Sequence, residues 1–400
     1  MQSKRLAIIG FALGLCFGLA AAQSVAADAA DILVYIGTHG TGGGGPPPAS
    51  PPTPAMIAAQ GIYAARFNTR TGQLTALGQQ IELQRATWLV THPSLPVIYT
   101  GADGGGGFLK ESGIYSYAVD RSTGKLQLLN KVGSGGLDAT HLALDPVSKT
   151  LLVANHGSGD VTALPLLKDG SVGAVVSDQK NFGKGPHPRQ SMPEPHSVAI
   201  DPGRRFVLSA DFGADRIFVY RFSGATRMLT PAETPFEAVA PGSGPRHMVF
   251  SRNGKFLYVD TELSAELHTY QWDARNGRLH PAQVLSPYPA GYTGVKSAAE
   301  LAISGDGRFV YLSLRGDQNS LIVYAVDKSA GTLTEVQRIA SGGIGPWSFA
   351  LDPTGRWLLS TNEGSGTVTV LGVDKASGRL GATSGSLSVP VPVAIAFVRN

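Results

Sequence analysis

A turn sequence that recurs about every 50 residues, short apolar runs on either side of each turn, and the lack of sustained helical periodicity after the N-terminal leader predict an all-β fold, a seven-bladed β-propeller. Residues 244–262 show the repeating unit most clearly. There the apolar runs Met248–Phe250 and Phe256–Val259 are joined by the turn Ser251–Lys255. Runs this short, rich in β-branched and aromatic residues, are typical of an antiparallel strand pair.

The turn occurs in six copies along the chain. The copies begin at His92, Asp145, Asp201, Ser251, Ser304 and Asp352. Their spacings are 53, 56, 50, 53 and 48 residues. A period of this length, with several short strands in each period, is typical of a propeller in which each period forms one blade.

Each period also contains a third strand and a hairpin into a fourth, outer strand. The third strands are expected at residues 61–68, 113–120, 160–165, 216–222, 266–273, 320–327 and 367–374. Many of them are followed by Thr-Gly-x-Leu or a near variant, which is a hairpin signal. Seven third strands therefore predict seven four-stranded blades.

The two ends of the chain are expected to complete one blade. Residues 31–37 resemble a second strand that no first strand precedes, and residues 392–398 resemble a first strand that no second strand follows. The two fragments complement each other. We therefore expect the ring to close by pairing of the N- and C-terminal strands, which removes the exposed sheet edges of an open ring.

The sequence before the propeller has the features of a secretory signal peptide over residues 1–27. Lys4 and Arg5 precede an apolar run that is too short to span a bilayer comfortably, and small residues follow it. This leader predicts a periplasmic or secreted protein, with the propeller at residues 28–400. Residues 40–54 are rich in Gly and Pro and are expected to form a flexible loop.

The net charge and the cysteine content indicate which binding partners and cross-links are not expected. The formal net charge of +4 falls to +2 without Lys4 and Arg5, and no basic run follows, so nucleic-acid binding is not expected. Cys16 is the only cysteine and lies in the leader, so the mature chain forms no disulfide. We expect a monomer that binds a small molecule and has no membrane attachment after cleavage of the leader.

Propeller geometry brings the starts of the inner strands and the loops between second and third strands to one face. These positions carry His141, Asn155, His196, Arg246, His247, Glu262, Glu300 and Arg315. So many imidazole, carboxylate and guanidinium groups at one axial mouth predict a binding or catalytic site, although surface loops are often polar without any function. Because Arg246 and His247 are neighbours, one of them is expected to face the axis. His141 and His196 are as well suited to a structural hydrogen bond as to catalysis.

Several common chemistries lack their motifs. No Gly-x-Ser-x-Gly elbow lies on a strand-to-helix turn, so a serine nucleophile is not expected. No His-Glu-x-x-His or cysteine cluster is present, so a zinc site is not expected either. We expect no cofactor, but a divalent cation held by oxygen atoms stays open, with Glu262, Glu300, Asp211 or Asn155 as ligands.

Motifs spread over residues 32–398 resemble those of one known family. They include Tyr35-Ile-Gly-Thr38, Val153–Ser158, Pro195-His-Ser197, Asp211–Tyr220, Gly242–His247, Glu262-Leu-Ser264, Thr293-Gly, Ala299-Glu300 and Arg315-Gly. The sequence is thus similar to the propeller lactonases typified by bacterial 6-phosphogluconolactonase and fungal carboxymuconate cyclase. This chain has Glu194 where the family often has His, and Leu314 where Asn commonly precedes the arginine.

The resemblance implies that His196, Arg246, Glu262 and Arg315 are catalytic. The leading hypothesis is hydrolysis of a small sugar-acid or related lactone, such as 6-phosphogluconolactone. Two arginines would hold an anionic group or the developing oxyanion, and Glu262 or His196 would take a proton from the attacking water. The residues expected to bind substrate are His141, Asn155, His247 and Glu300. Two alternatives stay open, a muconate-type lactonising isomerase and a non-catalytic periplasmic ligand-binding or scaffold propeller.

Overall fold

The computed structural model describes residues 31–39, 60–102 and 112–398 of the 400-residue chain. The predicted signal peptide and the predicted loop at residues 40–54 lie outside these ranges. The described residues form 28 β-strands. Within these ranges there is no helix that is long and apolar enough to cross a membrane.

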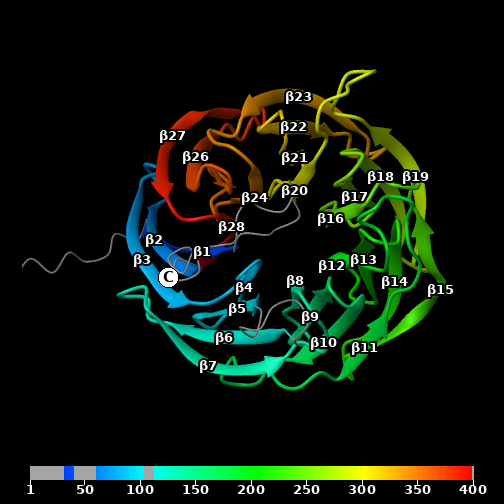
Figure 1. Ribbon diagram of the computed structural model, residues 1–400, viewed down its shortest axis with the longest axis horizontal. Helices are drawn as coiled ribbons and strands as arrows, with labels where there is room; N and C mark the ends of the chain where they lie inside the picture. The colour runs from blue at the N-terminus through cyan, green and yellow to red at the C-terminus, as the bar shows by residue number, and fades with distance from the viewer. Residues whose placement is uncertain (1–30, 40–59, 103–111, 399–400) are drawn as a thin grey trace, which may run out of the picture.

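The strands form seven four-stranded antiparallel sheets arranged in a ring, as seen down the axis in Figure 1. The inner strands are β28 (Pro392–Val398), β4 (Leu89–Thr91), β8 (Ala139–Asp145), β12 (Pro195–Ile200), β16 (Pro245–Phe250), β20 (Ala298–Ile303) and β24 (Pro346–Leu351). The second strands are β1 (Asp31–Thr38), β5 (Val97–Ala102), β9 (Thr150–Asn155), β13 (Phe206–Asp211), β17 (Phe256–Thr261), β21 (Phe309–Leu314) and β25 (Trp357–Asn362).

The remaining strands lie farther from the axis. The third strands are β2 (Gly61–Asn68), β6 (Gly113–Val119), β10 (Asp160–Pro165), β14 (Arg216–Ser223), β18 (Leu267–Asp273), β22 (Ser320–Val326) and β26 (Thr367–Val373). The outer strands are β3 (Leu74–Glu82), β7 (Leu126–Gly133), β11 (Ser177–Lys180), β15 (Met228–Ala238), β19 (Arg278–Leu285), β23 (Leu333–Ala340) and β27 (Leu380–Ser388). The seven-bladed, four-stranded architecture is confirmed, and the third strands lie within one residue of their predicted limits.

One blade contains both ends of the described chain. Its strand order is β28-β1-β2-β3, and β1 pairs with β28 in an antiparallel register that places Leu33 opposite Val398 and Ile36 opposite Ile395. In Figure 1 the blue β1 lies beside the red β28, next to the last full blade of the chain. The predicted closure by pairing of the N- and C-terminal strands is confirmed.

The core of the ring is divided among the interfaces between blades. Seven hydrophobic clusters are present, one for each pair of neighbouring blades. At the closing interface, Ile36 and Phe67 of the first blade pack with Leu359 and Val370 of the last one, and all four side chains are buried. The closing blade therefore supplies apolar packing on its side of the ring as well as strand pairing.

The recurring turn lies between the first and second strands and has a physical basis. The Asp201 carboxylate accepts hydrogen bonds from the backbone amides of Gly203, Arg205 and Phe206, at 3.0, 2.6 and 2.7 Å. Asp352 binds the backbone of its own turn in the same way. Asp is suited to this position because its short carboxylate satisfies amides two and more residues ahead.

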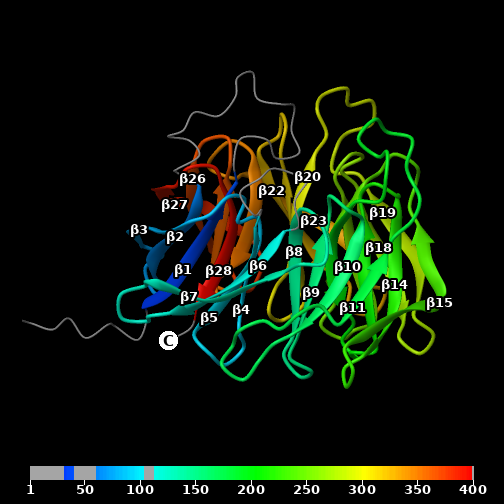
Figure 2. The ribbon, with the colours of Figure 1, turned by 60° about the horizontal axis from the view of Figure 1, so that its bottom comes forward.

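At the opposite end, near the axis, the inner strands are irregular. In six blades the register shifts at the start of the inner strand, between Ala139 and His141, Pro195 and Ser197, Pro245 and Met248, Ala298 and Leu301, Pro346 and Ser348, and Pro392 and Ala394. Each shift is a β-bulge, which inserts an extra residue and redirects the side chains beside it. In the turned view of Figure 2, the neighbouring strands β8, β9 and β10 of one blade run side by side.

The register of the closing strand pair is testable by cross-linking. We expect the double variant Ile36→Cys/Ile395→Cys, in a Cys16→Ser background, to form a disulfide spontaneously, because residues 36 and 395 are directly opposite and their side chains share one cluster. The cross-link should raise stability by about 2–5 kcal/mol, because it closes a very long loop. Thiol titration and unfolding with and without reductant measure both effects.

The control pair Ile36→Cys/Phe397→Cys is displaced by two residues along β28 and should remain reduced. Equal oxidation of the two pairs would contradict the described register.

Candidate active site

A narrow cavity of about 70 Å³ lies at the mouth of the ring where the inner strands begin. Its lining consists almost entirely of polar and aromatic side chains. They are His39, Arg85, Thr87, Trp88, Asp138, Thr140, His156, Arg189, His196, Arg246, His247, Glu262 and Trp347. Of the eight predicted site residues, His196, Arg246, His247 and Glu262 line this cavity, so the inner-strand starts and the second-to-third-strand loops do converge.

Arg246 and His247 both line the cavity, so the expectation that one of them would face the axis is wrong. The reason is the bulge between Pro245 and Met248 at the start of β16. A regular strand points neighbouring side chains to opposite faces, but the extra residue of a bulge breaks this alternation. Asp260 secures the bulge by accepting a hydrogen bond from the His247 backbone amide at 2.7 Å.

Glu262 is the centre of an arginine cluster. Its Oε2 atom lies 3.0 Å from the Nε atom of Arg246 and 3.0 Å from a terminal nitrogen of Arg315. Its Oε1 atom lies 2.9 Å from a terminal nitrogen of Arg189. Arg315 does not line the mouth cavity, but its contact with Glu262 joins it to the site. Three of the four predicted catalytic residues thus form one ion-paired group.

The charge of this cluster determines the ionisation of Glu262. Burial by itself would raise the pKa of the carboxyl group, but Arg315, Arg246 and Arg189 outweigh burial and bring the pKa of Glu262 to about 2. The side chain is therefore ionised at neutral pH. Trp347 lies against the cluster, with the guanidinium carbons of Arg315 and Arg246 at 4.5 and 5.5 Å from its ring centre.

A chain of hydrogen bonds runs from Arg246 through His247 to Glu300. A terminal nitrogen of Arg246 lies 3.3 Å from His247 Nε2, and His247 Nδ1 lies 2.8 Å from Glu300 Oε1. Because a guanidinium has donors and no acceptor, Nε2 must accept and Nδ1–H must donate to Glu300. Glu300 also accepts from Ser348 Oγ at 2.8 Å and from the Leu301 amide at 3.0 Å.

Burial shifts the pKa values of Glu300 and His247 in opposite directions. It raises the pKa of Glu300 to about 7, although Arg246 acts in the opposite direction. Burial and the charge of Arg246 hold the pKa of His247 well below its usual range, so the imidazole is neutral at physiological pH. A neutral imidazole in one fixed tautomer orients Arg246 without adding a further positive charge to the cluster.

His196 approaches the cluster from β12. Its ring lies 5.2 Å from that of His247 and 5.6 Å from that of His156. Within the described part of the chain its Nδ1 atom has no hydrogen-bond partner. Burial and the nearby Arg246 hold the pKa of His196 well below its usual range. This imidazole is therefore a neutral group with an unused nitrogen beside the cavity.

Three of the residues predicted to bind substrate lie away from the mouth cavity. His141 packs on Trp88 at 4.3 Å between ring centres, and its Nδ1 atom accepts a hydrogen bond from the Val198 amide at 3.4 Å. His141 and Glu300 line an adjoining axial cavity of about 290 Å³. The Asn155 side chain is fully buried, and its amide nitrogen donates to Thr162 of β10, the neighbouring strand of the same blade.

The sequence analysis missed Arg85, Asp138 and Arg189. All three come from connections between an outer strand and the next inner strand, which the repeat pattern did not include. Arg85 and Asp138 pair at 2.8 Å across neighbouring blades. Arg189 comes from the long connection between β11 and β12, and its position just before the Pro195-His-Ser197 motif was the one available signal.

The residues that could have held a divalent cation lie in different surroundings. Glu262 is bound by arginines, Glu300 by His247 and Ser348, and Asp211 by Asn181. Over residues 31–39, 60–102 and 112–398, no group of three or more His, Cys, Asp or Glu side chains is arranged to hold a metal ion.

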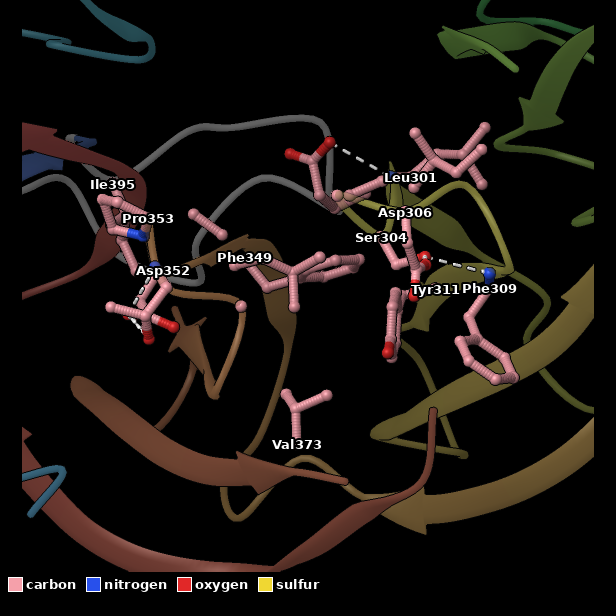
Figure 3. A pocket seen from close by; sticks show the side chains of 18 of the residues that line it. Leu301, Ser304, Asp306, Phe309, Tyr311, Phe349, Asp352, Pro353, Val373 and Ile395 are labelled. Atoms are coloured by element: carbon pink, nitrogen blue, oxygen red, sulfur yellow. Dashed lines mark hydrogen bonds between the residues drawn. The ribbon is translucent and has the colours of Figure 1, made fainter. Parts of the chain in front are cut away.

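A wider cavity of about 650 Å³ lies along the axis on the side of the recurring turns. In Figure 3, Phe349 lies between Asp352 on one side and Ser304 and Asp306 on the other, with Leu301, Val373 and Ile395 among the apolar walls. Asp352 binds backbone amides, and Asp306 binds Arg308 at 2.7 Å. Asp352 and Asp306 thus hold turns, whereas Glu300, which also lines the wide cavity, binds His247 and Ser348.

Comparison with known proteins identifies close relatives over nearly the full chain. Residues 50–397 match the family described as "Lactonase, 7-bladed beta-propeller". The 6-phosphogluconolactonase of Bacillus subtilis is 32% identical over 368 residues, covering 92% of this chain and 98% of the relative. That of Pectobacterium carotovorum is 32% identical over 268 residues, covering 67% and 76%. The structure of a periplasmic gluconolactonase from Pseudomonas aeruginosa aligns with a TM-score of 0.82 at 32% identity, covering 92% and 99%.

Glu194, beside the site, gives a testable dependence of stability on pH. Burial and the neighbouring Asp211 raise the pKa of Glu194 to about 7, above its value in the unfolded chain. The wild type therefore loses stability as the pH rises from the unfolded pKa through about 7, because the native state must then carry a second charge beside Asp211. Glu194→Gln removes that charge, so the variant should be more stable than wild type at pH 8. We expect a difference of about 1 kcal/mol, because partial exposure to solvent weakens the effect of the charge. At pH 5 the two proteins should be equally stable.

Denaturant unfolding of both proteins at the two pH values measures the difference. The matched control Glu233→Gln, at a residue on the outer strand β15 that is 71% exposed, should show no such dependence. A stability difference for Glu194→Gln that is the same at both pH values would contradict the description.

Proposed function

This chain belongs to the seven-bladed β-propeller lactonase family, and on that premise we propose that it hydrolyses the ring ester of a small sugar-acid lactone in the mouth cavity. One observation supports this most strongly. The Glu262 carboxylate is ionised, buried and held at 3.0 Å by both Arg246 and Arg315 in the lining of the mouth cavity. A fixed base next to fixed cations is what ester hydrolysis requires.

The reaction follows from the atoms of this cluster. Water attacks the lactone carbonyl carbon while Glu262 Oε1 accepts one of its protons. The carbonyl oxygen becomes negatively charged and is stabilised by the guanidinium groups of Arg246 and Arg315, whose contacts with Glu262 and the backbone leave further N–H donors. When the tetrahedral intermediate collapses, the bond between the carbonyl carbon and the ring oxygen breaks. The ring oxygen takes the proton from Glu262, and the product is a hydroxy acid.

His196 and the chain from His247 to Glu300 have supporting roles in this proposal. His196 accepts a hydrogen bond from the attacking water, and this contact directs a lone pair of the water oxygen toward the carbonyl carbon. His247 holds Arg246 in place through its Nε2 atom at 3.3 Å, and Glu300 holds His247 through its Nδ1 atom at 2.8 Å. Arg246 is 1% exposed, and its position is set by these contacts together with those to Glu262, the Ala299 carbonyl and Trp347. The proposed steps use only groups of this chain and need no cofactor.

We propose a periplasmic location and a monomeric enzyme. The leader with Lys4 and Arg5 favours export, and one structural relative is a periplasmic gluconolactonase. A gluconolactone or its 6-phosphate is the substrate class that the relatives' names support.

Replacement of Glu262 tests the proposed function. Glu262→Gln keeps the shape of the side chain but cannot accept a proton, so kcat on sugar lactones should fall by about 10²–10⁴-fold. Glu262→Asp keeps the charge between the arginines and withdraws the base, and it should fold like wild type with reduced kcat. Acid release from glucono-1,5-lactone and its 6-phosphate, corrected for spontaneous hydrolysis, measures the rates.

The surface variant Glu335→Gln, which loses a pair with Arg338, should hydrolyse both lactones at the wild-type rate. Wild-type rates in a folded Glu262→Gln protein would overturn the assignment of the base. A wild-type protein that accelerates neither lactone would overturn the proposed activity itself.

A further inference from the structure

We propose that Arg189 controls access to the base of the proposed lactonase reaction. In the free protein it covers Oε1 of Glu262, and an anionic group on the substrate draws it away and exposes this oxygen to the attacking water. The proposal rests on the function above and assigns Arg189 as the residue that favours anionic lactones over neutral ones.

The two oxygens of Glu262 have different partners. Arg246 and Arg315 both bind Oε2, each at 3.0 Å. Arg189 binds Oε1 at 2.9 Å and is the one cation on that oxygen among the described residues. If Glu262 accepts a proton from water while Arg246 and Arg315 stay in place, Oε1 must be the accepting atom. Arg189 therefore stands on the atom that the reaction needs.

The three arginines also differ in their freedom to move. The side chains of Arg246 and Arg315 are 1% and 9% exposed, whereas that of Arg189 is 40% exposed. Moving either buried arginine would leave a buried charge unpaired, which is costly. Moving Arg189 transfers its charge toward solvent. The structure therefore allows one of the three contacts to Glu262 to be exchanged at low cost.

The backbone beneath Arg189 is fixed, so the motion is confined to its side chain. Gln190 is fully buried, and its side-chain amide donates to the Phe212 carbonyl and to Asp215, each at 2.7 Å. The guanidinium carbon of Arg189 lies 4.7 Å from the centre of the Phe212 ring. This ring supports the guanidinium group along one face while its edge donors remain free to change partners.

Charge determines which substrates can make the exchange. Three guanidinium groups surround one carboxylate, so the mouth attracts anions. A phosphate or carboxylate on the lactone offers Arg189 charge-assisted hydrogen bonds equivalent to those it gives up with Glu262. A neutral lactone offers no such acceptor, and Arg189 then stays on Oε1 for most of the time. An anionic substrate group is thus recognised by the same movement that exposes the base.

Release of Arg189 also strengthens the base, because Arg189 is one of the three cations that lower the pKa of Glu262. A base with a pKa nearer to the working pH transfers protons more effectively. The charged and titratable groups that act on Glu262 are Arg189, Arg246, Arg315, His156, His247, Glu194 and Asp260. The two histidines are neutral at physiological pH, and Arg246 and Arg315 are buried and stay in place. The departure of Arg189 is therefore the change that raises the pKa of Glu262 during turnover.

The test compares Arg189→Gln with wild type on glucono-1,5-lactone and on its 6-phosphate. We expect the preference for the phosphorylated lactone, as a ratio of kcat/KM values, to fall by about 10- to 100-fold, since a hydrogen bond between charged groups is lost. The acid limb of kcat/KM for the neutral lactone should move to higher pH, because Glu262 has lost one cation. Arg189→Lys should restore part of the preference.

The control Arg204→Gln removes an arginine of similar exposure that pairs with Asp145 in a turn at the other end of the blade. It should leave both the preference and the pH profile unchanged. If Arg189→Gln lowers both lactones equally and leaves the acid limb in place, Arg189 has a structural role and the proposal is wrong.

A binding measurement separates this proposal from the proposed function. By calorimetry, wild type should bind 6-phosphogluconate more tightly than gluconate, and Arg189→Gln should lose most of that difference. If this loss occurs without any lactonase activity, the anion-binding role of Arg189 stands while its link to the base and the lactonase assignment both fail. If the difference persists in the variant, Arg189 does not bind the phosphate and the proposal is overturned.

Discussion

The pairing of β1 with β28 fixes the position of every blade, because a ring closes at one circumference only. With Ile36 opposite Ile395, the first and last blades pack through a shared cluster of the same kind that joins the other neighbours. The inner strands then begin at a common mouth, and six of them begin with a bulge. The bulge at the start of β16 brings Arg246 and His247 into the same small cavity.

The mouth cavity brings charged side chains together in a buried place, where each charge needs a partner of opposite sign. Burial raises the pKa of Glu262, yet three arginines outweigh it and keep the carboxylate ionised, and Glu262 in turn pairs the buried charge of Arg246. Glu300, farther from the cluster and bound to a neutral His247, has its pKa raised to about 7 by the same burial. Two buried glutamates from neighbouring blades therefore have pKa values shifted in opposite directions, because their partners differ in charge. The wider cavity on the other face has more room but no comparable cluster.

Repetition made the fold predictable from sequence, and departures from repetition limited the prediction of the site. The turn at Asp201 and its copies have a local hydrogen-bonding cause, so blade number and closure could be derived. Glu262 and His196 were found because they stand at repeated positions. Arg189 was missed because the repeat pattern did not include the connections between an outer strand and the next inner strand. Asn155 was misplaced because its position at the end of β9 does not show that its side chain bonds to Thr162 of the neighbouring strand. The bulge that turns both Arg246 and His247 inward leaves no sign in the period of the strand.

A structure of the wild-type protein crystallised with 6-phosphogluconate would test the account most directly. The account predicts the sugar acid in the narrow mouth cavity, with its carboxylate beside Arg246 and Arg315 and with Arg189 turned from Glu262 to the phosphate. A sugar acid seated in the wide cavity between Phe349 and Asp352, or bound at the mouth while Arg189 still covers Glu262, would contradict it.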